Sequence, residues 1–523
     1  MKLKKSFPVA IAVSVVLASF AYGSVLTVTP RLSVEESYTD NSSLSENNTE
    51  SDYVTTISPS VNMDFMQKHM GVDFFYDYQH QIYGDKTENN SSRHSAGLTG
   101  WAELSKRTKL TLGERFLRVE DPLREEDRIL LPDEDPYLMR DSLVRRSRDP
   151  YYTYNSSAGL AHQFGENDYL NLNYLFSVRE DKAADGNSSK RHTPGVGVTY
   201  WVTPQYGIDA SFDYTRARFD NNGKIRTTNL NNSDAFDDED FDDMDSNLKV
   251  SRKITKHFDI YIAYNHVVRD FKNDGQVLSD VLGRNQNSDY QIHSPSTGIS
   301  YEIDKDTSFS LGVGYFFQNL KDEEDDPSGL FVDSSLTRNW RFQRGSFRLS
   351  GSSGMDRNDF GYQSRGFERF YDLAGKLTYE LTRHLSGNLG TGLRRNEFIN
   401  DKRNETDNND EIENRVIFNA GLNYRPKRWM TASTNYTHSL LYSDDNNNLR
   451  DSTPDTNDQG NGTVDDHSRF NIGVTFTPKE WLFINMNYSH SRLNSDLSEE
   501  DNEENRASIS ITLVPERPYR HVY

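Results

Sequence analysis

The sequence predicts an all-β protein: a transmembrane antiparallel up-and-down β-barrel of about 22 strands, with 20 as the alternative count. Three observations predict this fold. Apolar and polar residues alternate along many segments of the chain. The connections between these segments are alternately very short and long and acidic. The first residues resemble an export signal and leave the rest of the chain without any segment apolar enough to cross a bilayer as a helix.

Composition narrows the class of protein before any element is placed. The chain has 523 residues, a net charge of −21, 34% hydrophobic and 12% aromatic residues, and no cysteine. Disordered chains are poor in aromatics, so low hydrophobicity here does not indicate disorder. A nucleic-acid partner is disfavoured because a phosphate backbone needs a basic surface. The lack of cysteine excludes disulfides and thiolate metal sites.

The N-terminal segment, residues 1–23, predicts a secretory signal peptide. Lys2, Lys4 and Lys5 precede an apolar run from Phe7 to Phe20, and small residues follow it. A transmembrane anchor is the alternative, but the run is short for a spanning helix. We therefore expect the barrel domain to comprise residues 24–523.

The strands are predicted from a repeated phrase that begins at a short polar turn. In "TFTPKEWLFINMNYSH" from Thr475, the apolar series Leu482, Ile484, Met486 and Tyr488 alternates with mostly polar residues. Similar phrases begin at Trp201, Lys253, Glu380 and Asn423. Successive side chains of a strand point to opposite faces, so each phrase predicts one strand with an apolar and a polar face.

The connections predict which ends of the strands lie together. Short ones such as "KHM", "TPQ" and "PKE" alternate with long acidic ones such as "NNSDAFDDEDFDDMDS" from Asn231. This is typical of a transmembrane β-barrel with short periplasmic turns and long acidic extracellular loops, in the outer membrane of a Gram-negative bacterium. A soluble sandwich or propeller is the alternative, but it would rarely keep every long loop at one end.

The stretch from Thr337 to Phe370 is harder to assign. Trp340 and Phe342 share one parity, whereas Phe347 and Leu349 have the other. A β-bulge near Arg344 and Gly345 would explain the switch. The segment therefore either adds a hairpin to the barrel or folds inward.

Aromatic residues near strand ends predict two interfacial girdles in contact with outer-membrane lipid and lipopolysaccharide. These residues are Tyr214, Tyr264, Tyr436, Tyr488, Trp429 and Trp481. Histidines follow in "YNH", "YTH" and "YSH", and their shared outward parity favours the headgroup region over a metal site. An inward tyrosine such as Tyr261 could instead stack against a ligand.

The opposite parity predicts a polar lumen of mixed charge, suited to polar solutes. The lumen-facing candidates are Asp73, Asp77, Asp209, Asp213, Glu302, Arg341, Asp372 and Lys376. The loop Glu120–Pro150 contains several apolar residues. We expect it either to form a constriction inside the barrel or to extend a hairpin above the membrane.

Calcium is the only metal that the loops suggest, because flexible acidic loops offer hard oxygen ligands. The weak candidates are Asp237 and Asp240 in one acidic run and Asp455 and Asn457 in another. The second run lacks the closing glutamate of a calcium loop, so a solvated loop is the simpler interpretation. No cofactor is expected. An enzyme is not expected either, since the sequence has no nucleophile elbow and no His-Glu-x-x-His helix.

The chain resembles the β-barrel porins encoded near exopolysaccharide and PEP-CTERM systems in Gram-negative bacteria. The resemblance rests on the repeated turn–strand phrase and on "GSFRLSGSSGMDRNDFGYQSRGFERFYDLAGKLTYELT" from Gly345. It implies an outer-membrane location and a role in transport or polysaccharide export, with export or cell-envelope components as partners. It assigns no site residues. The final segment departs from the pattern, since Pro515 and Pro518 follow the last expected strand.

Three functions therefore remain open at this point. The first is a porin-like channel or conduit for polar solutes or exported polysaccharide. The second is a closed structural or adhesive barrel, and the third is an outer-membrane hydrolase. A barrel of about 20 strands leaves a lumen too wide for side chains alone to fill, which favours the channel.

Overall fold

The computed structural model describes residues 24–45, 47, 49–120, 150–181, 188–220, 240–272, 289–320, 328–357, 367–399, 411–443, 463–495 and 501–522. The predicted signal peptide and the interior of the Glu120–Pro150 loop lie outside these ranges. The described residues contain no helix long and apolar enough to span a bilayer.

The described residues form 23 β-strands and one short 3-10 turn, Thr87–Asn89. The strands are β1 (Val25–Thr39), β2 (Asp52–Gln67), β3 (Met70–Tyr83), β4 (Ser91–Ser105), β5 (Thr108–Val119), β6 (Tyr151–Gln163), β7 (Tyr169–Asp181), β8 (Ser188–Thr203), β9 (Tyr206–Asp220), β10 (Phe241–Lys253), β11 (Phe258–Phe271), β12 (Tyr290–Asp304), β13 (Thr307–Leu320), β14 (Ser328–Phe342), β15 (Gly345–Arg357), β16 (Phe367–Glu380), β17 (Leu385–Ile399), β18 (Glu411–Lys427), β19 (Met430–Ser443), β20 (Thr463–Lys479), β21 (Leu482–Ser495), β22 (Asn502–Leu513) and β23 (Tyr519–Val522).

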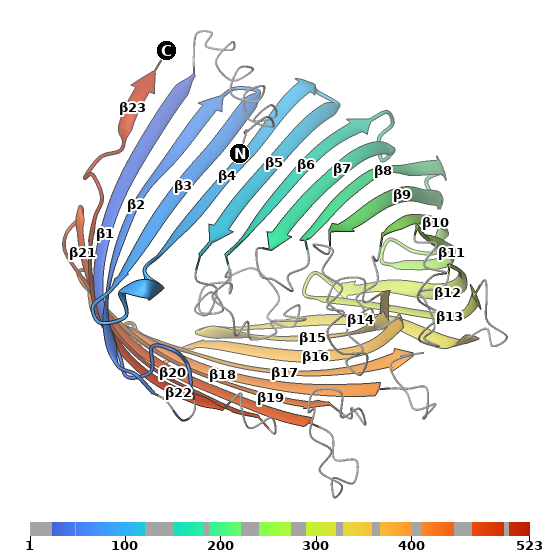
Figure 1. The fold of residues 1–523 in the computed structure, drawn as a ribbon. Coiled ribbons are helices and arrows are strands. Elements are labelled where there is room, and N and C mark those ends of the chain that lie inside the picture. The colour runs from blue at the N-terminus through green and yellow to red at the C-terminus, as the bar shows by residue number, and fades with distance from the viewer. Residues whose placement is uncertain are drawn as a thin grey trace, which may run out of the picture.

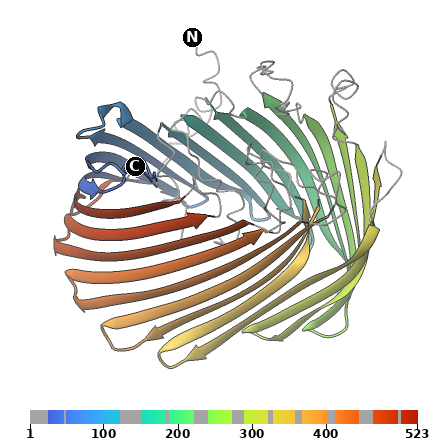
Figure 2. The same cartoon turned by 60° about the horizontal axis from the view of Figure 1, so that its bottom comes forward.

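Each strand from β1 to β22 pairs antiparallel with its neighbour in the chain, and β22 pairs with β1. The sheet therefore closes into a 22-stranded barrel whose tilted strands form a continuous wall (Figures 1 and 2). Because the sheet closes, no long strand edge is left unpaired. The backbone N–H and C=O groups therefore bond to neighbouring strands, as they must in a bilayer whose hydrocarbon offers no hydrogen bonds. The predicted fold class and strand count are confirmed, with β23 as one additional strand.

The closing seam is divided between two strands. Leu32–Thr39 of β1 pairs with β22, and Val25–Val28 pairs with β23. Residues 514–518, which include Pro515 and Pro518, interrupt the partner strand between them. Pro30 of β1 lies opposite this interruption. Proline has no backbone N–H to donate. β1 therefore tolerates a proline best opposite this interruption, where no partner strand needs the hydrogen bond.

The connections alternate as predicted, with two to five residues at one end of the barrel and six or more at the other. We call these the short-turn end and the long-loop end. The predicted bulge near Arg344 and Gly345 is wrong. Phe342 pairs directly with Gly345, so Gln343 and Arg344 form a hairpin turn between β14 and β15. A turn resets the side-chain parity as a bulge does, and the segment adds a hairpin to the wall.

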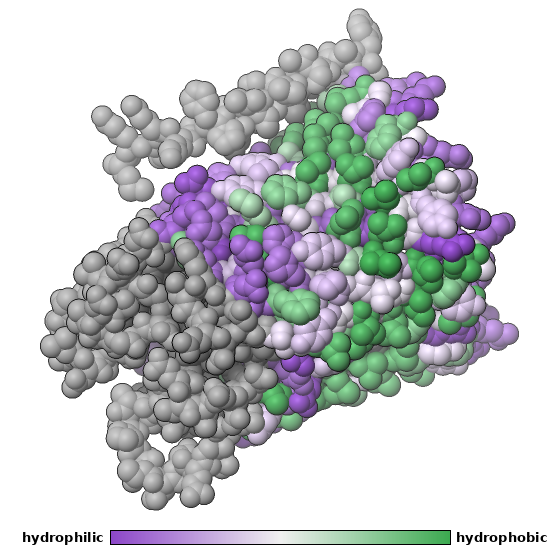
Figure 3. All heavy atoms as spheres, turned by 90° about the vertical axis from the view of Figure 1, so that its right-hand side faces the viewer, coloured by the Kyte–Doolittle hydropathy of each residue, from purple (hydrophilic) through white to green (hydrophobic). Residues whose placement is uncertain are grey.

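The outer surface carries the apolar face of each strand. Alternate residues such as Ile262, Val250 and Leu389 are 69%, 45% and 48% exposed. On the face drawn in Figure 3, hydrophobic residues gather in a band with hydrophilic residues on either side. An apolar outer band around a closed barrel matches a bilayer. The protein is an outer-membrane barrel of a Gram-negative bacterium.

The orientation of the barrel can be tested by single-cysteine labelling, because the chain has no native cysteine. We expect a membrane-impermeant maleimide to label Glu88→Cys, at the long-loop end, on intact cells. Gln205→Cys, in the short turn between β8 and β9, should react only after lysis. Equal labelling of both variants on intact cells would contradict long loops on the outside.

Candidate functional site

The inner wall of the barrel is the candidate functional site. The strand register places all eight lumen-facing candidates on the face opposite the exposed apolar residues. Asp209, for example, lies between Ile208 and Ala210 on β9 and opposite Lys249 on β10. Lys249 is flanked in turn by Leu248 and Val250, which are 47% and 45% exposed on the outer face. The same alternation holds at the other candidates.

The wall from β7 to β11 carries hydrogen-bonded carboxylates. Asp209 accepts a hydrogen bond from the Thr199 hydroxyl at 2.8 Å. Asp213 accepts one from the Asn173 amide at 3.3 Å. Next to Asp213, Asp245 accepts one from Asn265 at 2.8 Å. These bonds fix the carboxylates in place and leave a polar, acid-rich surface.

The wall from β12 to β17 is of mixed charge. At the short-turn end, Arg341 pairs with Asp306 at 2.8 Å, and Glu302 is exposed. Further along, Asp372 lies 3.6 Å from Arg394. Lys376 lies opposite Arg348 of β15. The remaining candidates lie on β3, where Asp73 is opposite Asp64 and Asp77 is opposite Ser60.

Two buried ion pairs on the inner face of the barrel were missed by sequence reasoning. Arg269 and Asp243 lie 2.8 Å apart, with side chains 4% and 9% exposed. Arg394 and Glu368 lie 3.4 Å apart, with side chains 7% and 0% exposed. The alternation of side chains along each strand predicts that all four residues point inward. Which of them form pairs depends on the register between neighbouring strands, and the local sequence does not determine that register.

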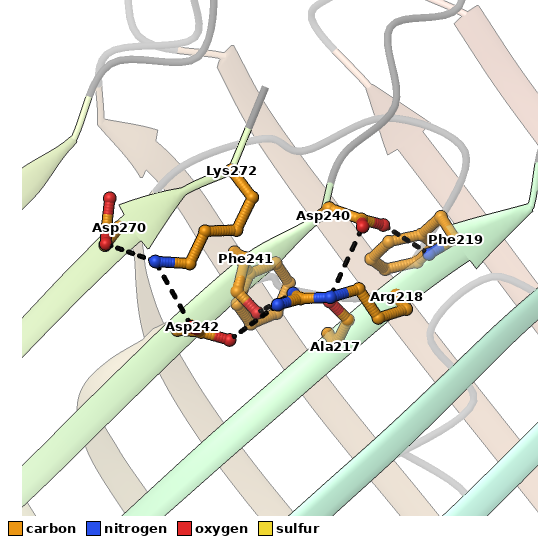
Figure 4. Close-up of polar contacts among 8 residues, drawn as sticks. All are labelled: Ala217, Arg218, Phe219, Asp240, Phe241, Asp242, Asp270 and Lys272. Atoms are coloured by element: carbon orange, nitrogen blue, oxygen red, sulfur yellow. Dashed lines mark hydrogen bonds and ion pairs between the residues drawn. The ribbon is translucent and has the colours of Figure 1, made fainter. Parts of the chain in front are cut away.

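The long-loop end near β9 to β11 has a ladder of alternating charges (Figure 4). Arg218 contacts Asp240 at 3.4 Å and Asp242 at 3.2 Å. Lys272 contacts Asp242 at 3.2 Å and Asp270 at 2.5 Å. Hydrogen bonds to these two aspartates raise the pKa of Lys272 despite the opposing effect of desolvation. The ladder ties three neighbouring strands together above the apolar band.

Only one of the four calcium candidates, Asp240, lies in the described part of the chain. Asp240 belongs to the charge ladder, where it also accepts a hydrogen bond from the backbone N–H of Phe219 at 2.7 Å. Asp237, Asp455 and Asn457 lie outside the described residues. Within the described part of the chain, no group of three or more histidine, aspartate or glutamate residues is arranged to hold a metal ion.

The six girdle candidates lie at two levels of the outer wall. The four tyrosines lie near the middle of strands of 14 or 15 residues, whereas Trp429 and Trp481 lie in short turns. The Tyr264 hydroxyl is 2.6 Å from Nδ1 of His293, and Tyr436 stacks on His438 with 6.4 Å between ring centroids. Tyr488 donates to Asn505 at 2.7 Å. In the short turns, Trp429 stacks on Phe476 and Trp481 is 38% exposed. Tyr214 lies opposite Met244 on the same outer face.

One carboxylate organises the long-loop end between β3 and β4. Oδ1 of the buried Asp52 accepts hydrogen bonds from the backbone N–H groups of Tyr53, Gly84 and Asp85, at 2.7, 3.0 and 3.0 Å. Oδ2 accepts one from Lys86 at 3.0 Å. Burial alone would raise the pKa of Asp52, but these four donors lower it below its ordinary value of 3.8. The ionised form therefore anchors the loop.

We expect Asp52→Ala to increase hydrogen exchange at Gly84–Lys86, because their acceptor is removed. The stabilisation requires the carboxylate. It is complete above the ordinary pKa of 3.8 and is lost as pH falls through the lower folded value. Protection factors measured by mass spectrometry at neutral pH test this, with Asp85→Ala as control. Equal protection in wild type and Asp52→Ala would contradict the anchoring role.

Comparisons with known proteins agree with this fold. No protein-family model matches the sequence, and no curated protein matches it. Among solved structures, the FrpB iron transporter of Neisseria meningitidis superposes with a TM-score of 0.56 at 12% identity, over 93% of this chain and 81% of that one. A ferric enterobactin receptor mutant from Pseudomonas aeruginosa, in complex with enterobactin, gives 0.54 at 10% identity, over 94% and 81%.

The siderophore receptor PirA of Pseudomonas aeruginosa gives a TM-score of 0.51 at 8% identity, over 93% of this chain and 80% of the receptor. At such identities the likeness extends to the fold alone. These three structures are a siderophore receptor, an iron transporter and a ferric enterobactin receptor. The chain is thus a large outer-membrane barrel that shares the overall fold of these three structures.

Proposed function

We propose that the barrel is a porin-like channel that lets polar solutes, including saccharides, cross the outer membrane. The observation that carries the proposal is the contrast between the two faces of the wall. The outer face is apolar and exposed, whereas the inner face bears hydrogen-bonded acids and bases of both signs. A polar inner wall suits the passage of hydrated solutes.

The preferred solutes are uncharged or cationic. The chain has a net charge of −21, and acidic residues are dense in the long loops. A mouth of one sign of charge raises the local concentration of counter-ions and repels co-ions. Salt weakens this preference, because the Debye length is only about 10 Å at 0.1 M.

Conductance in planar bilayers tests the proposal. The purified barrel should produce discrete conductance steps, and reversal potentials in a KCl gradient should show cation preference that declines as salt increases. Anion preference at low salt would contradict the charge argument. Failure to conduct in any condition would reject the channel.

A closed structural barrel is the second candidate, and one observation favours it. Several inward apolar side chains near the long-loop end are almost fully buried, among them Val54, Tyr83 and Phe316, each 1% exposed. A wall covered in this way at one end would fit a plugged lumen. Stable, heat-resistant folding without conductance is the outcome expected of this second function.

A further inference from the structure

One row of the inner wall combines aromatic residues, glycines and charges in a way that the proposed channel does not by itself require. The register pairs these residues directly, strand after strand, from β8 to β14: Trp201, Gly207, Ser251, Tyr261, Gly298, Gly312 and Asp333. We call this the lumenal row.

The lumenal row faces the interior. On β8, the neighbours of Trp201 are Tyr200 and Val202, which are 45% and 56% exposed on the outer face. On β11, the neighbours of Tyr261 are Ile260 and Ile262, which are 38% and 69% exposed on the same face. Since successive side chains alternate, Trp201 and Tyr261 point into the barrel.

The two rings lie along the wall rather than across the lumen, because glycines make room for them. A Cβ on Gly207 would come within 3.1 Å of the Trp201 ring. A Cβ on Gly298 would come within 2.5 Å of both Cζ and the hydroxyl of Tyr261, and one on Gly312 within 2.5 Å of that hydroxyl. The missing side chains therefore let one face of each ring rest on backbone while the other face is turned to the lumen.

A lysine covers the lumenal face of each ring. Lys253 Nζ lies 3.8 Å from the centroid of the Trp201 ring, and Lys249 Nζ lies 4.4 Å from that of Tyr261. Each lysine has an aspartate directly opposite on a neighbouring strand, Asp259 for Lys253 and Asp209 for Lys249. The two stacks thus combine a flat apolar surface with donors and acceptors at its border.

We propose that the lumenal row binds a chain of uncharged pyranose sugars, with Trp201 and Tyr261 as stacking platforms. This inference rests on the proposed channel and names its substrate class. A pyranose ring has a flat face of C–H groups surrounded by hydroxyls. An aromatic ring buries the apolar face, and charged or amide groups around it hydrogen-bond to the hydroxyls.

A ligand must displace the two lysines to reach the aromatic rings. An ammonium over an aromatic face is held only weakly where water reaches it. A sugar can therefore displace the lysine from the ring, and the released Lys249 or Lys253 then donates hydrogen bonds to sugar oxygens. The facing aspartates offset the lysine charge, so an uncharged chain is favoured over an acidic one.

The spacing suits a ligand of several sugar units. Trp201 and Tyr261 belong to strands three steps apart in the sheet, or about 14 Å at about 4.8 Å a step. Because barrel strands tilt by about 35–45°, a row perpendicular to them runs obliquely along the lumen. A sugar chain lying on the row would thus advance along the channel as it passes from one platform to the other.

A matched control lies elsewhere on the inner wall. Phe75 of β3 also lies over a glycine, within 2.2 Å of a Cβ placed on Gly97. The described cation–π contacts include no lysine over Phe75. It therefore shares the aromatic–glycine packing of the lumenal row but not its polar border.

Isothermal titration of the detergent-solubilised barrel with maltohexaose tests the inference without requiring conductance. Wild type should bind, and Trp201→Ala and Tyr261→Ala should each weaken binding about five- to tenfold. Tyr261→Phe and Phe75→Ala should bind as wild type does. Heat-modifiable electrophoretic mobility confirms that each variant is folded.

The same variants are then used in planar bilayers, where maltohexaose should interrupt the wild-type current and hexagalacturonate should do so less. Absence of maltohexaose binding to folded wild type, or equal binding by Trp201→Ala and Phe75→Ala, would overturn the lumenal row as a sugar site even if the channel conducts. Tighter binding of hexagalacturonate would overturn the uncharged class. A barrel that binds maltohexaose but never conducts would keep the site and reject the channel.

Discussion

Replacing Arg269 by methionine is expected to destabilise the folded barrel by about 3–5 kcal/mol, the largest effect of any single substitution that we consider. Arg269 is paired with Asp243 at 2.8 Å, and both side chains are almost fully buried against the inner wall. The guanidinium group also lies over the Phe241 ring, 4.0 Å from its centroid. Removing it takes the Arg269 charge away from the buried Asp243 carboxylate. Urea unfolding followed by tryptophan fluorescence measures the loss.

Two further variants test whether the cost of losing the ion pair comes from its burial. Arg338→Met breaks an ion pair with Asp304 at the short-turn end, where the side chains are 33% and 45% exposed. Pairs this exposed contribute at most about 1 kcal/mol. The double variant Arg269→Met with Asp243→Leu should recover much of the stability, because both charges of the buried pair are removed together. The explanation fails if Arg269→Met costs no more than Arg338→Met.

Met486→Arg is expected to destabilise the barrel by about 2–4 kcal/mol and to reduce its amount in the outer membrane. Met486 is 46% exposed on the outer face of β21 and has Ile509 opposite it on β22. An arginine here would face hydrocarbon near the middle of the bilayer. Urea titration of refolded protein in lipid vesicles gives the free energy of unfolding.

The adjacent residue provides the control. Asn487→Arg places the same charge one position along β21, where the side chain faces the lumen and is exposed to water. We expect a change of less than about 0.5 kcal/mol, as for ordinary surface substitutions. Asn485 is a poorer control, since it hydrogen-bonds to Thr475 and Ser510. Equal effects of Met486→Arg and Asn487→Arg would contradict the assignment of the two faces.

The fold could be predicted from sequence because the bilayer imposes it residue by residue. A lipid-facing residue must be apolar and its neighbour faces water, as the series Leu482, Ile484, Met486 and Tyr488 shows. The turn at Gln343 and Arg344 was missed for a physical reason. Neither residue is a glycine, proline, asparagine or aspartate, so the usual turn signal is absent.

The candidate site was predicted only in outline. Parity places Trp201 between two lipid-facing residues and so assigns it to the lumen, as it does Tyr261. Parity cannot show that Tyr261 spans Gly298 and Gly312, because those glycines come from two other strands. Their alignment depends on the stagger between strands, which is set by turn geometry and packing rather than by the local sequence.

The divided seam has a consequence for how fast the barrel forms and how long it lasts. Every other strand pairs with its chain neighbour, so those contacts can form as successive hairpins. The seam instead joins residues as distant as Ser33 and Thr512, whose hydroxyls meet at 2.9 Å across 479 positions. The seam contacts have the largest sequence separations among the described strand pairings, so they carry the largest loop-closure entropy and should form last. In the finished barrel the same joint, shared between β22 and the four residues of β23, is where opening would begin, and its rate of opening sets the lifetime of the folded state.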